Sequence, residues 1–370
     1  MNANVFLNLS KIIERDSKST TYKFALLRGV IDIIGDASPY IKCTDTEAHL
    51  PLGLLIEKWI LYYYPIFDAP IAIPQINGNT KLAFQSELTA LISYYKPRGG
   101  LSAFYNDLRT EGVSAEIAPE FLALVKKVGE TIVKMPMRYI GGSVANAHYS
   151  IFRYGVLRRP KPGNTLNLEW LIQSYDSFII PLEYYEALRL LGSFLSGTDA
   201  IIFKWAEFSV TASQGRLQPE KVLEEVLRSP VTDRDVADAK RLYKSVLEKV
   251  GFVECVWTGK KLDTYDVDHV IPFAIWKNND LWNLLPAQPA VNNQKRHRIP
   301  SVASLEARKP NIIHYWELLK AYQEPRFSTE IRVSLLGGPV GVNWQHLAFE
   351  KLKQTSDYLI NTRGHEAWNL

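Results

Sequence analysis

The stretch DVDHVIPF, residues 266–273, places a carboxylate beside an imidazole at the end of an apolar run. Asp268 offers hard oxygens, which are the ligands that magnesium prefers. His269 exchanges a proton near neutral pH, as a general base must. A strand interior rarely buries either side chain without a partner. The pair therefore indicates a chemical site rather than a piece of core, if further polar residues join it.

More polar residues follow in the stretch NLLPAQPAVNNQKRHR, after the polar loop WKNND. Asn283 opens an apolar segment typical of a second strand, and a later proline suits the first position of a helix. On that helix Asn292, Lys295 and Arg296 are three and four residues apart and share one face. Strand, loop, strand and helix form a unit too small for its own core. We expect it to pack against the helices around it.

Together these residue types supply the parts of a metal-assisted phosphodiester hydrolysis site. His269 would take a proton from an attacking water. Asp268 and Asn292 would give oxygens to Mg²⁺, or to another divalent ion such as Mn²⁺, which usually keeps several of its waters. Lys295 and Arg296 would bind phosphates near a helix N-terminus.

The motif DVDHVIPF…NLLPA…NNQK resembles the HNH endonucleases, whose core is a ββα-metal nuclease fold. The resemblance covers roughly residues 252–301, with the order and spacing of the motif intact. It implies that His269 is the general base and that Asp268 is a metal ligand beside it. Asn283 would be the middle asparagine, which braces the loop and orients the histidine.

In the third position of the motif, usually His or Asn, the resemblance places Asn292 as a second metal ligand. Lys295 matches the family's frequent asparagine-x-x-lysine ending. Asn293 and His297 remain alternatives for the third ligand, although the helical phase relative to Lys295 favours Asn292. The reading requires the imidazole of His269 and the amide of Asn292 to converge on one hydrated cation.

Cysteine usage departs from many HNH proteins, in which two CxxC pairs hold a structural zinc. Here the first pair is reduced to Cys255 in CVWTG, and the later pair is absent. We therefore expect no structural zinc, with Trp257, Phe273 and Trp282 packing in its place. The chain has two cysteines in all, which excludes a disulfide framework.

Two points of geometry stay open in the sequence. Adjacent strand residues point to opposite faces, so Asp268 and His269 serve one site only if the strand twists or ends there, or if they flank the phosphate. Pro272 is consistent with an ending. Asp266 shares a strand face with Asp268. It is either a carboxylate that supports the site or a solvated residue of the strand.

Around this unit the chain is mainly helical. Apolar side chains recur at helical spacing in sets beginning at Phe24, Phe84 and Phe121. Segments 148–156 and 177–180 have the pattern of strands. We predict a mainly α protein with a small α+β part, in which a helical recognition or oligomerisation domain, residues 1–215, precedes an HNH nuclease domain with C-terminal helices, residues 216–370. The polar stretch 211–220 marks the boundary.

The composition is that of a globular protein, with 46% hydrophobic and 22% charged residues among 370. The net charge of +4 permits a nucleic-acid partner without demanding one. No apolar run is long enough to span a bilayer, and the first residues lack an export signal. We expect a cytoplasmic protein without a membrane partner.

The leading hypothesis is a magnesium-dependent DNA endonuclease, similar to bacterial restriction and anti-phage defence proteins with helical N-terminal regions. One site cuts one strand, so a double-strand break would require a homodimer, a second event or a defence-system partner. One alternative is an inactive HNH unit that binds nucleic acid or acts as a scaffold. Another is an HNH nuclease that acts on RNA or single-stranded DNA.

Overall fold

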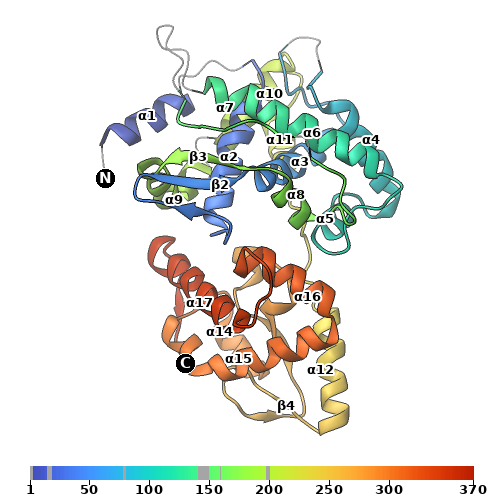
Figure 1. Cartoon of the computed structure of the whole chain (residues 1–370), viewed down its shortest axis with the longest axis vertical. Helices are drawn as coiled ribbons and strands as arrows, with labels where there is room; N and C mark the ends of the chain where they lie inside the picture. Colours follow the sequence, from blue (N-terminus) through green and yellow to red (C-terminus); the bar gives the residue numbers. More distant parts are fainter. Residues whose placement is uncertain (1–2, 15–18, 78–80, 141–149, 159, 197–200) are drawn as a thin grey trace. The chain divides into compact units, whose positions relative to one another are not determined.

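The computed structural model describes residues 3–14, 19–77, 81–140, 150–158, 160–196 and 201–370. The chain divides into two compact units, Met1–Pro230 and Val231–Leu370. Both are mostly helical, and the second unit also contains small two-stranded sheets (Figure 1). The mainly α fold with a small α+β part is therefore confirmed. The division follows α11 (Pro219–Val226), because that helix packs on helices of the first unit.

The first unit is built around α3, whose side chains are buried on nearly all sides, as expected of a central helix. The three apolar stripes predicted from sequence form α2, α4 and α6. The helices of this unit are α1 (Ala3–Glu14), α2 (Tyr22–Gly35), α3 (Leu52–Asp68), α4 (Gln85–Tyr95), η1 (Lys96–Arg98), α5 (Gly100–Arg109), α6 (Ala118–Lys134), α7 (Pro136–Tyr139), α8 (Leu168–Ser174), α9 (Leu182–Ser196), α10 (Ile201–Ala212) and α11.

One antiparallel sheet of order β1-β2-β3 accompanies these helices, and α9 packs beside it (Figure 1). Its strands are β1 (Lys42–Cys43), β2 (Glu47–Pro51) and β3 (Ser177–Pro181). The strand predicted at 177–180 is confirmed. The strand predicted at 148–156 is wrong for 150–156, where Arg153 makes an isolated bridge to Ile179; residues 148–149 lie outside the described residues. A single bridge supplies too few ladder bonds to extend the sheet.

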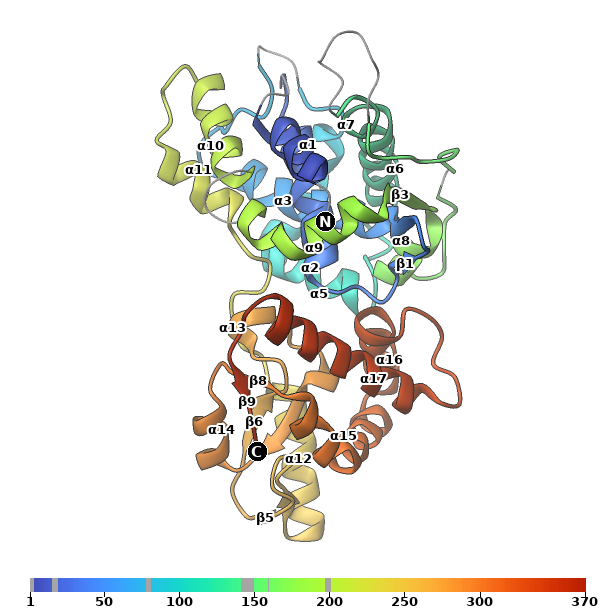
Figure 2. The same ribbon diagram turned by 90° about the vertical axis from the view of Figure 1, so that its left-hand side faces the viewer.

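The second unit has a ββα arrangement at its centre (Figure 2). Strand β6 pairs antiparallel with β7, with His269 opposite Leu284, and α14 packs beside β6. The elements of this unit are α12 (Ala237–Val250), β4 (Val253–Glu254), β5 (Lys261–Leu262), β6 (Asp266–His269), α13 (Phe273–Trp276), η2 (Leu281–Asn283), β7 (Leu284–Ala287), α14 (Pro289–Lys295), β8 (Ile299–Pro300), α15 (Val302–Tyr322), α16 (Glu324–Ile331), η3 (Arg332–Leu336), α17 (Trp344–Asp357), η4 (Tyr358–Thr362) and β9 (Ala367–Trp368).

The helices that follow the ββα elements complete its core. Trp257, Trp282 and Trp316 are fully buried in one apolar cluster that joins the strands to α15. The ββα elements therefore lean on their neighbours, as their small size requires. A two-residue strand, β9, pairs parallel with β8 and was not predicted, because so short a strand has no periodicity. Among the described residues, no helix combines the length and the apolar character needed to cross a membrane.

Candidate active site

His269 is the last residue of β6, and its imidazole is 1% exposed. Its Nε2 lies 3.1 Å from the Oδ1 of Asn279, in the loop between the two strands. Its Nδ1 lies 3.1 Å from the Nη2 of Arg234, in the segment that precedes α12. Burial, together with the positive charges of Arg234 and Lys295, lowers the pKa of His269 to about 4, against the opposing effect of the hydrogen bond to Asn279. The imidazole is neutral at physiological pH.

The protons of this imidazole follow from its two partners. An amide oxygen only accepts hydrogen bonds, so Nε2 carries the proton and donates it to Asn279. The Nδ2 of Asn279 donates in turn to the carbonyl of Asp233 at 3.0 Å, which fixes which side of the amide faces the histidine. Nδ1 of His269 therefore holds the lone pair that would take a proton from water.

Asp268 is 3% exposed, and both of its oxygens accept hydrogen bonds. Oδ1 lies 3.0 Å from the Nζ of Lys295, and Oδ2 lies 2.7 Å from the Nε1 of Trp257. The ammonium of Lys295 is fully buried and also donates to the backbone oxygen of His269 at 2.6 Å. Burial lowers the pKa of Lys295, and the carboxylate of Asp268 opposes that shift.

The phosphate contact that the sequence predicts for Lys295 is not what the structure shows. Its ammonium faces the interior. Arg296 comes after the last residue of α14, so it does not share a helix face with Asn292 and Lys295. Lys295 points at Asp268, and Arg296 alone is exposed to solvent. The structure thus ties strand β6 to helix α14 through a buried ion pair.

One cavity of about 320 Å³ brings the predicted residues together. Asp268 and His269 both line it, since β6 ends at His269 and the alternation of a strand no longer separates them. The complete lining is Arg234, Asp268, His269, Pro272, Phe273, Ala274, Asn292, Asn293, Arg296 and His297. The three candidates for the third motif position thus all face the cavity.

Asn292 differs from the other two candidates in having an anchored amide. Its Nδ2 donates to Oδ2 of Asp266 at 3.1 Å, which leaves its oxygen as the group available to a cation. No hydrogen bond holds the side chain of Asn293 or His297 among the described residues. Asp266 is the carboxylate that the sequence left open, and its partner is Asn292.

Asn283 is fully buried and binds both ends of the loop that carries the histidine's partner. Its Oδ1 accepts from the backbone nitrogen of Ile271 at 2.8 Å, and its Nδ2 donates to the oxygens of Ile271 and Asn278 at 3.0 and 3.3 Å. The next residue after Asn278 is Asn279, which holds Nε2 of His269. The amide thus fixes the loop rather than the imidazole itself.

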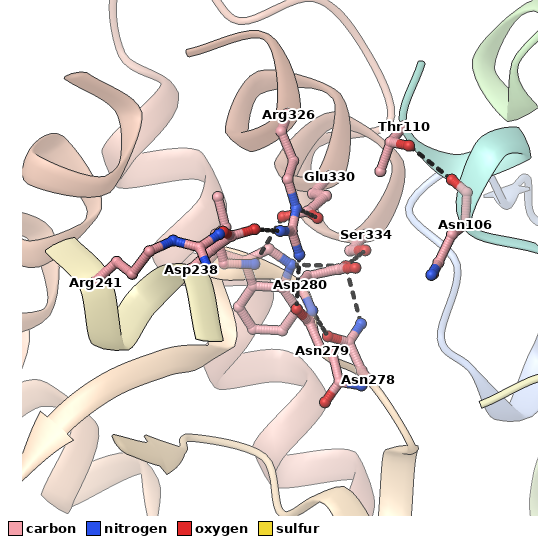
Figure 3. Close-up of polar contacts among 12 residues, drawn as sticks. Asn106, Thr110, Asp238, Arg241, Asn278, Asn279, Asp280, Arg326, Glu330 and Ser334 are labelled. Carbon is pink, nitrogen blue, oxygen red and sulfur yellow. Dashed lines mark hydrogen bonds and ion pairs between the residues drawn. The ribbon is translucent and has the colours of Figure 1, made fainter. Parts of the chain in front are cut away.

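Helix α16 supports the same loop through the side chains of Arg326 and Glu330 (Figure 3). Arg326 reaches from α16 to Asp238 on α12 and donates to the backbone oxygen of Asn279 at 3.3 Å. Glu330 accepts from Arg326 at 2.6 Å and from the backbone nitrogen of Leu281 at 2.7 Å. Burial, together with the charge of Asp280, raises the pKa of Glu330 to about 8.

Arg296 follows α14 with φ of 51° and ψ of −121°, a conformation that L-residues rarely adopt. Its exposed side chain lines the cavity with His269 and a second hollow with Arg298. Strain of this kind costs roughly 1–3 kcal/mol and is concentrated at functional sites. Arg296 is thus an exposed positive residue at the edge of the cavity that His269 lines.

Two residues that contact the histidine were missed in the sequence. Asn279 belongs to the polar loop WKNND between the motif segments, and its position inside that loop was a usable signal. Arg234 lies outside the motif altogether, and tertiary contact alone brings it to His269. No spacing rule connects it to the other residues.

Comparisons with known proteins assign the two units to different families. Residues 2–226 match the model of a domain of unknown function (DUF8808), and residues 255–301 match the model of an HNH endonuclease domain. No curated protein and no solved structure matches the chain. The chain therefore belongs to the DUF8808 family through its N-terminal region and carries an HNH endonuclease domain in its C-terminal unit.

Proposed function

We propose that the C-terminal unit hydrolyses phosphodiester bonds of DNA with the help of a divalent cation. One observation carries the proposal. A neutral imidazole with its proton on Nε2, a carboxylate and an anchored amide line the same cavity, beside an exposed arginine. These are the groups that metal-assisted hydrolysis of a phosphodiester requires.

The donor set of the cavity fits a magnesium-type ion. Asp268 supplies a carboxylate and Asn292 an amide oxygen, and Mg²⁺ needs few protein ligands because it keeps several waters. Among the described residues, no group of three His, Cys, Asp or Glu side chains is placed to hold a metal, and the set that we propose is one carboxylate and one amide. When bound there, the cation supplies positive charge to the phosphorane-like transition state and to the leaving 3′ oxygen.

The residues of the chain would perform the remaining steps. Nδ1 of His269 takes a proton from a water, and the resulting hydroxide attacks phosphorus opposite the 3′ oxygen, whose bond to phosphorus breaks. Asn279 holds the imidazole in the tautomer that this step needs. Arg296 pairs with a phosphate oxygen and so keeps the ester in line for attack.

Duplex DNA is the substrate that we propose, and a bacterial restriction or anti-phage role is the setting. The site contacts a phosphodiester rather than a base, so RNA and single-stranded DNA are tested beside the duplex. The first unit would recognise the target or join a second copy or a defence partner. A single site predicts nicking of one strand per event.

A plasmid-nicking assay with Mg²⁺ tests the proposal. Wild type is expected to nick, and His269→Ala to cut about 10²–10⁴ times more slowly, since a positioned general base contributes about that factor. His346→Ala is the matched control, because His346 is an exposed histidine on α17. Removal of the divalent ion with EDTA should abolish cutting. Equal nicking by wild type and His269→Ala contradicts the mechanism, and binding of DNA without cutting in any divalent ion favours a non-catalytic binding unit.

A further inference from the structure

The guanidinium of Arg234 occupies the one nitrogen of His269 that can accept a proton. Because Nε2 donates to Asn279, the lone pair of the neutral ring is on Nδ1. Arginine has donors and no acceptor, so the 3.1 Å contact between Nη2 and Nδ1 is an N–H donating to that lone pair. A water cannot pass its proton to Nδ1 while this hydrogen bond exists.

The rest of the ring offers no second route for a proton. The imidazole is 1% exposed, and Phe273 packs edge-to-face against it at 5.5 Å between ring centres. The imidazole of His269 therefore has the tautomer that hydrolysis needs, but Arg234 covers its basic nitrogen.

The side chain of Arg234 has few contacts that hold it at this position. It is exposed, in a segment without helix or strand that joins α11 to α12. No carboxylate of the described residues forms an ion pair with its guanidinium, whose polar partner there is a neutral ring nitrogen. An anion forms stronger, charge-assisted and bidentate hydrogen bonds with arginine than a neutral acceptor does.

The same cavity receives the displacing anion. Arg234 lines it together with Asp268, Asn292 and Arg296. A phosphate bound there would lie beside the side chain of Arg234. We propose that Arg234 caps His269 in the free protein and that the phosphate of the substrate draws the cap away, so that the base becomes active when nucleic acid is bound. This inference rests on the proposed nuclease function for its biological meaning.

The cap itself is testable without measuring cleavage. The ¹⁵N chemical shifts of the histidine side chains are recorded at one pH near neutrality for wild type and Arg234→Ala, with the signal of His269 assigned by its loss in His269→Ala. The Nδ1 shift is expected to differ between wild type and Arg234→Ala. Arg296→Ala is the matched control, because it removes an arginine from the same cavity that does not contact the ring; its Nδ1 shift should equal that of wild type.

A short DNA duplex is then added in EDTA, with binding followed by fluorescence anisotropy. We expect the wild-type Nδ1 shift to move to the value of free Arg234→Ala, and that of the variant to stay. Identical Nδ1 shifts in free wild type and free Arg234→Ala would show that Arg234 does not cap His269. If the DNA does not bind, or binds without moving the wild-type signal, the proposal that substrate phosphate displaces Arg234 from Nδ1 is wrong. Nuclease function is judged separately by the nicking rate of His269→Ala, so either idea can fail while the other stands.

Discussion

The chemistry of single residues in this site is decided by what each one touches inside the fold. His269 is neutral because it is buried and faces two positive charges, and it is oriented because an amide holds Nε2. Asp268, by contrast, keeps a charged partner at 3.0 Å. Positive charge thus acts on both sequence neighbours, but with opposite effects: it disfavours the protonated imidazole and attracts the carboxylate, which suits one for proton transfer and the other for holding a cation.

Asn292 is the residue whose removal should affect cation binding most. Asn292→Ala is expected to raise the Mg²⁺ concentration needed for half-maximal cutting by at least the roughly 10–100-fold that loss of a ligand's orienting partner costs, because it deletes the amide that we propose as a ligand and that Asp266 orients. Asn293→Ala, which changes the adjacent and unanchored amide, is the control. A loss of Mg²⁺ response in Asn293→Ala with none in Asn292→Ala would reassign the ligand, and the same holds for His297→Ala.

Lys295 should contribute to stability rather than to phosphate binding. Lys295→Met leaves the carboxylate of Asp268 buried without its charged partner, which typically costs about 3–5 kcal/mol. Hydrogen exchange of the β6 and α14 amides measures this locally, and faster exchange is expected there. Lys260→Met, at an exposed lysine, should change exchange little. Normal protection in Lys295→Met would show that the ion pair does not hold strand to helix.

At the level of elements, α16 fixes the loop that orients the histidine. Its residues Arg326 and Glu330 bind the backbone at Asn279 and Leu281. The loop needs this support because it has little regular structure between α13 and η2. A polar network that is fully paired makes such a segment rigid.

Glu330 should make the stability of the protein depend on pH. Its pKa is about 8 in the folded state against an ordinary 4.5, so the folded protein retains a proton that the unfolded chain has lost between those values. Stability should therefore fall as pH rises from about 5 to 8, by at most about 1.4 kcal/mol per pH unit. Glu330→Gln keeps an acceptor for Leu281 and cannot ionise. Thermal unfolding of both proteins across this range should show the melting temperature of the variant rising relative to that of wild type as pH increases. A difference that stays constant would contradict the shifted pKa.

Across the whole molecule, the regions that match known families agree with the two compact units of the structure. The DUF8808 match ends at 226 and the first unit at Pro230, whereas the HNH match falls inside the second unit. Each unit also has buried side chains of its own, which is the property of a domain. Recognition and cleavage are thus assigned to separate units in our proposal.

Limited trypsin digestion should reveal this division. Among the arginines and lysines that the structure describes, Arg228 and Arg234 are expected to be cut first, because they are exposed in the segment between α11 and α12. Intact mass of the two fragments identifies the site. The double variant Arg228→Gln, Arg234→Gln should slow this cut and leave others unchanged. An earlier cut inside either unit would show that the segment is not the most accessible one.

The sequence by itself determined the mainly helical class, the strands around His269 and Asn283, and the membership of the motif, because periodicity and fixed spacing are local properties of the chain. It also singled out Asp268, His269 and Asn292, which line one cavity in the structure. Tertiary structure alone decided that Lys295 faces inward, that Asp266 holds Asn292, and that Arg234 reaches the base. Those contacts join distant segments, and which side of a short helix is buried depends on the neighbours that cover it.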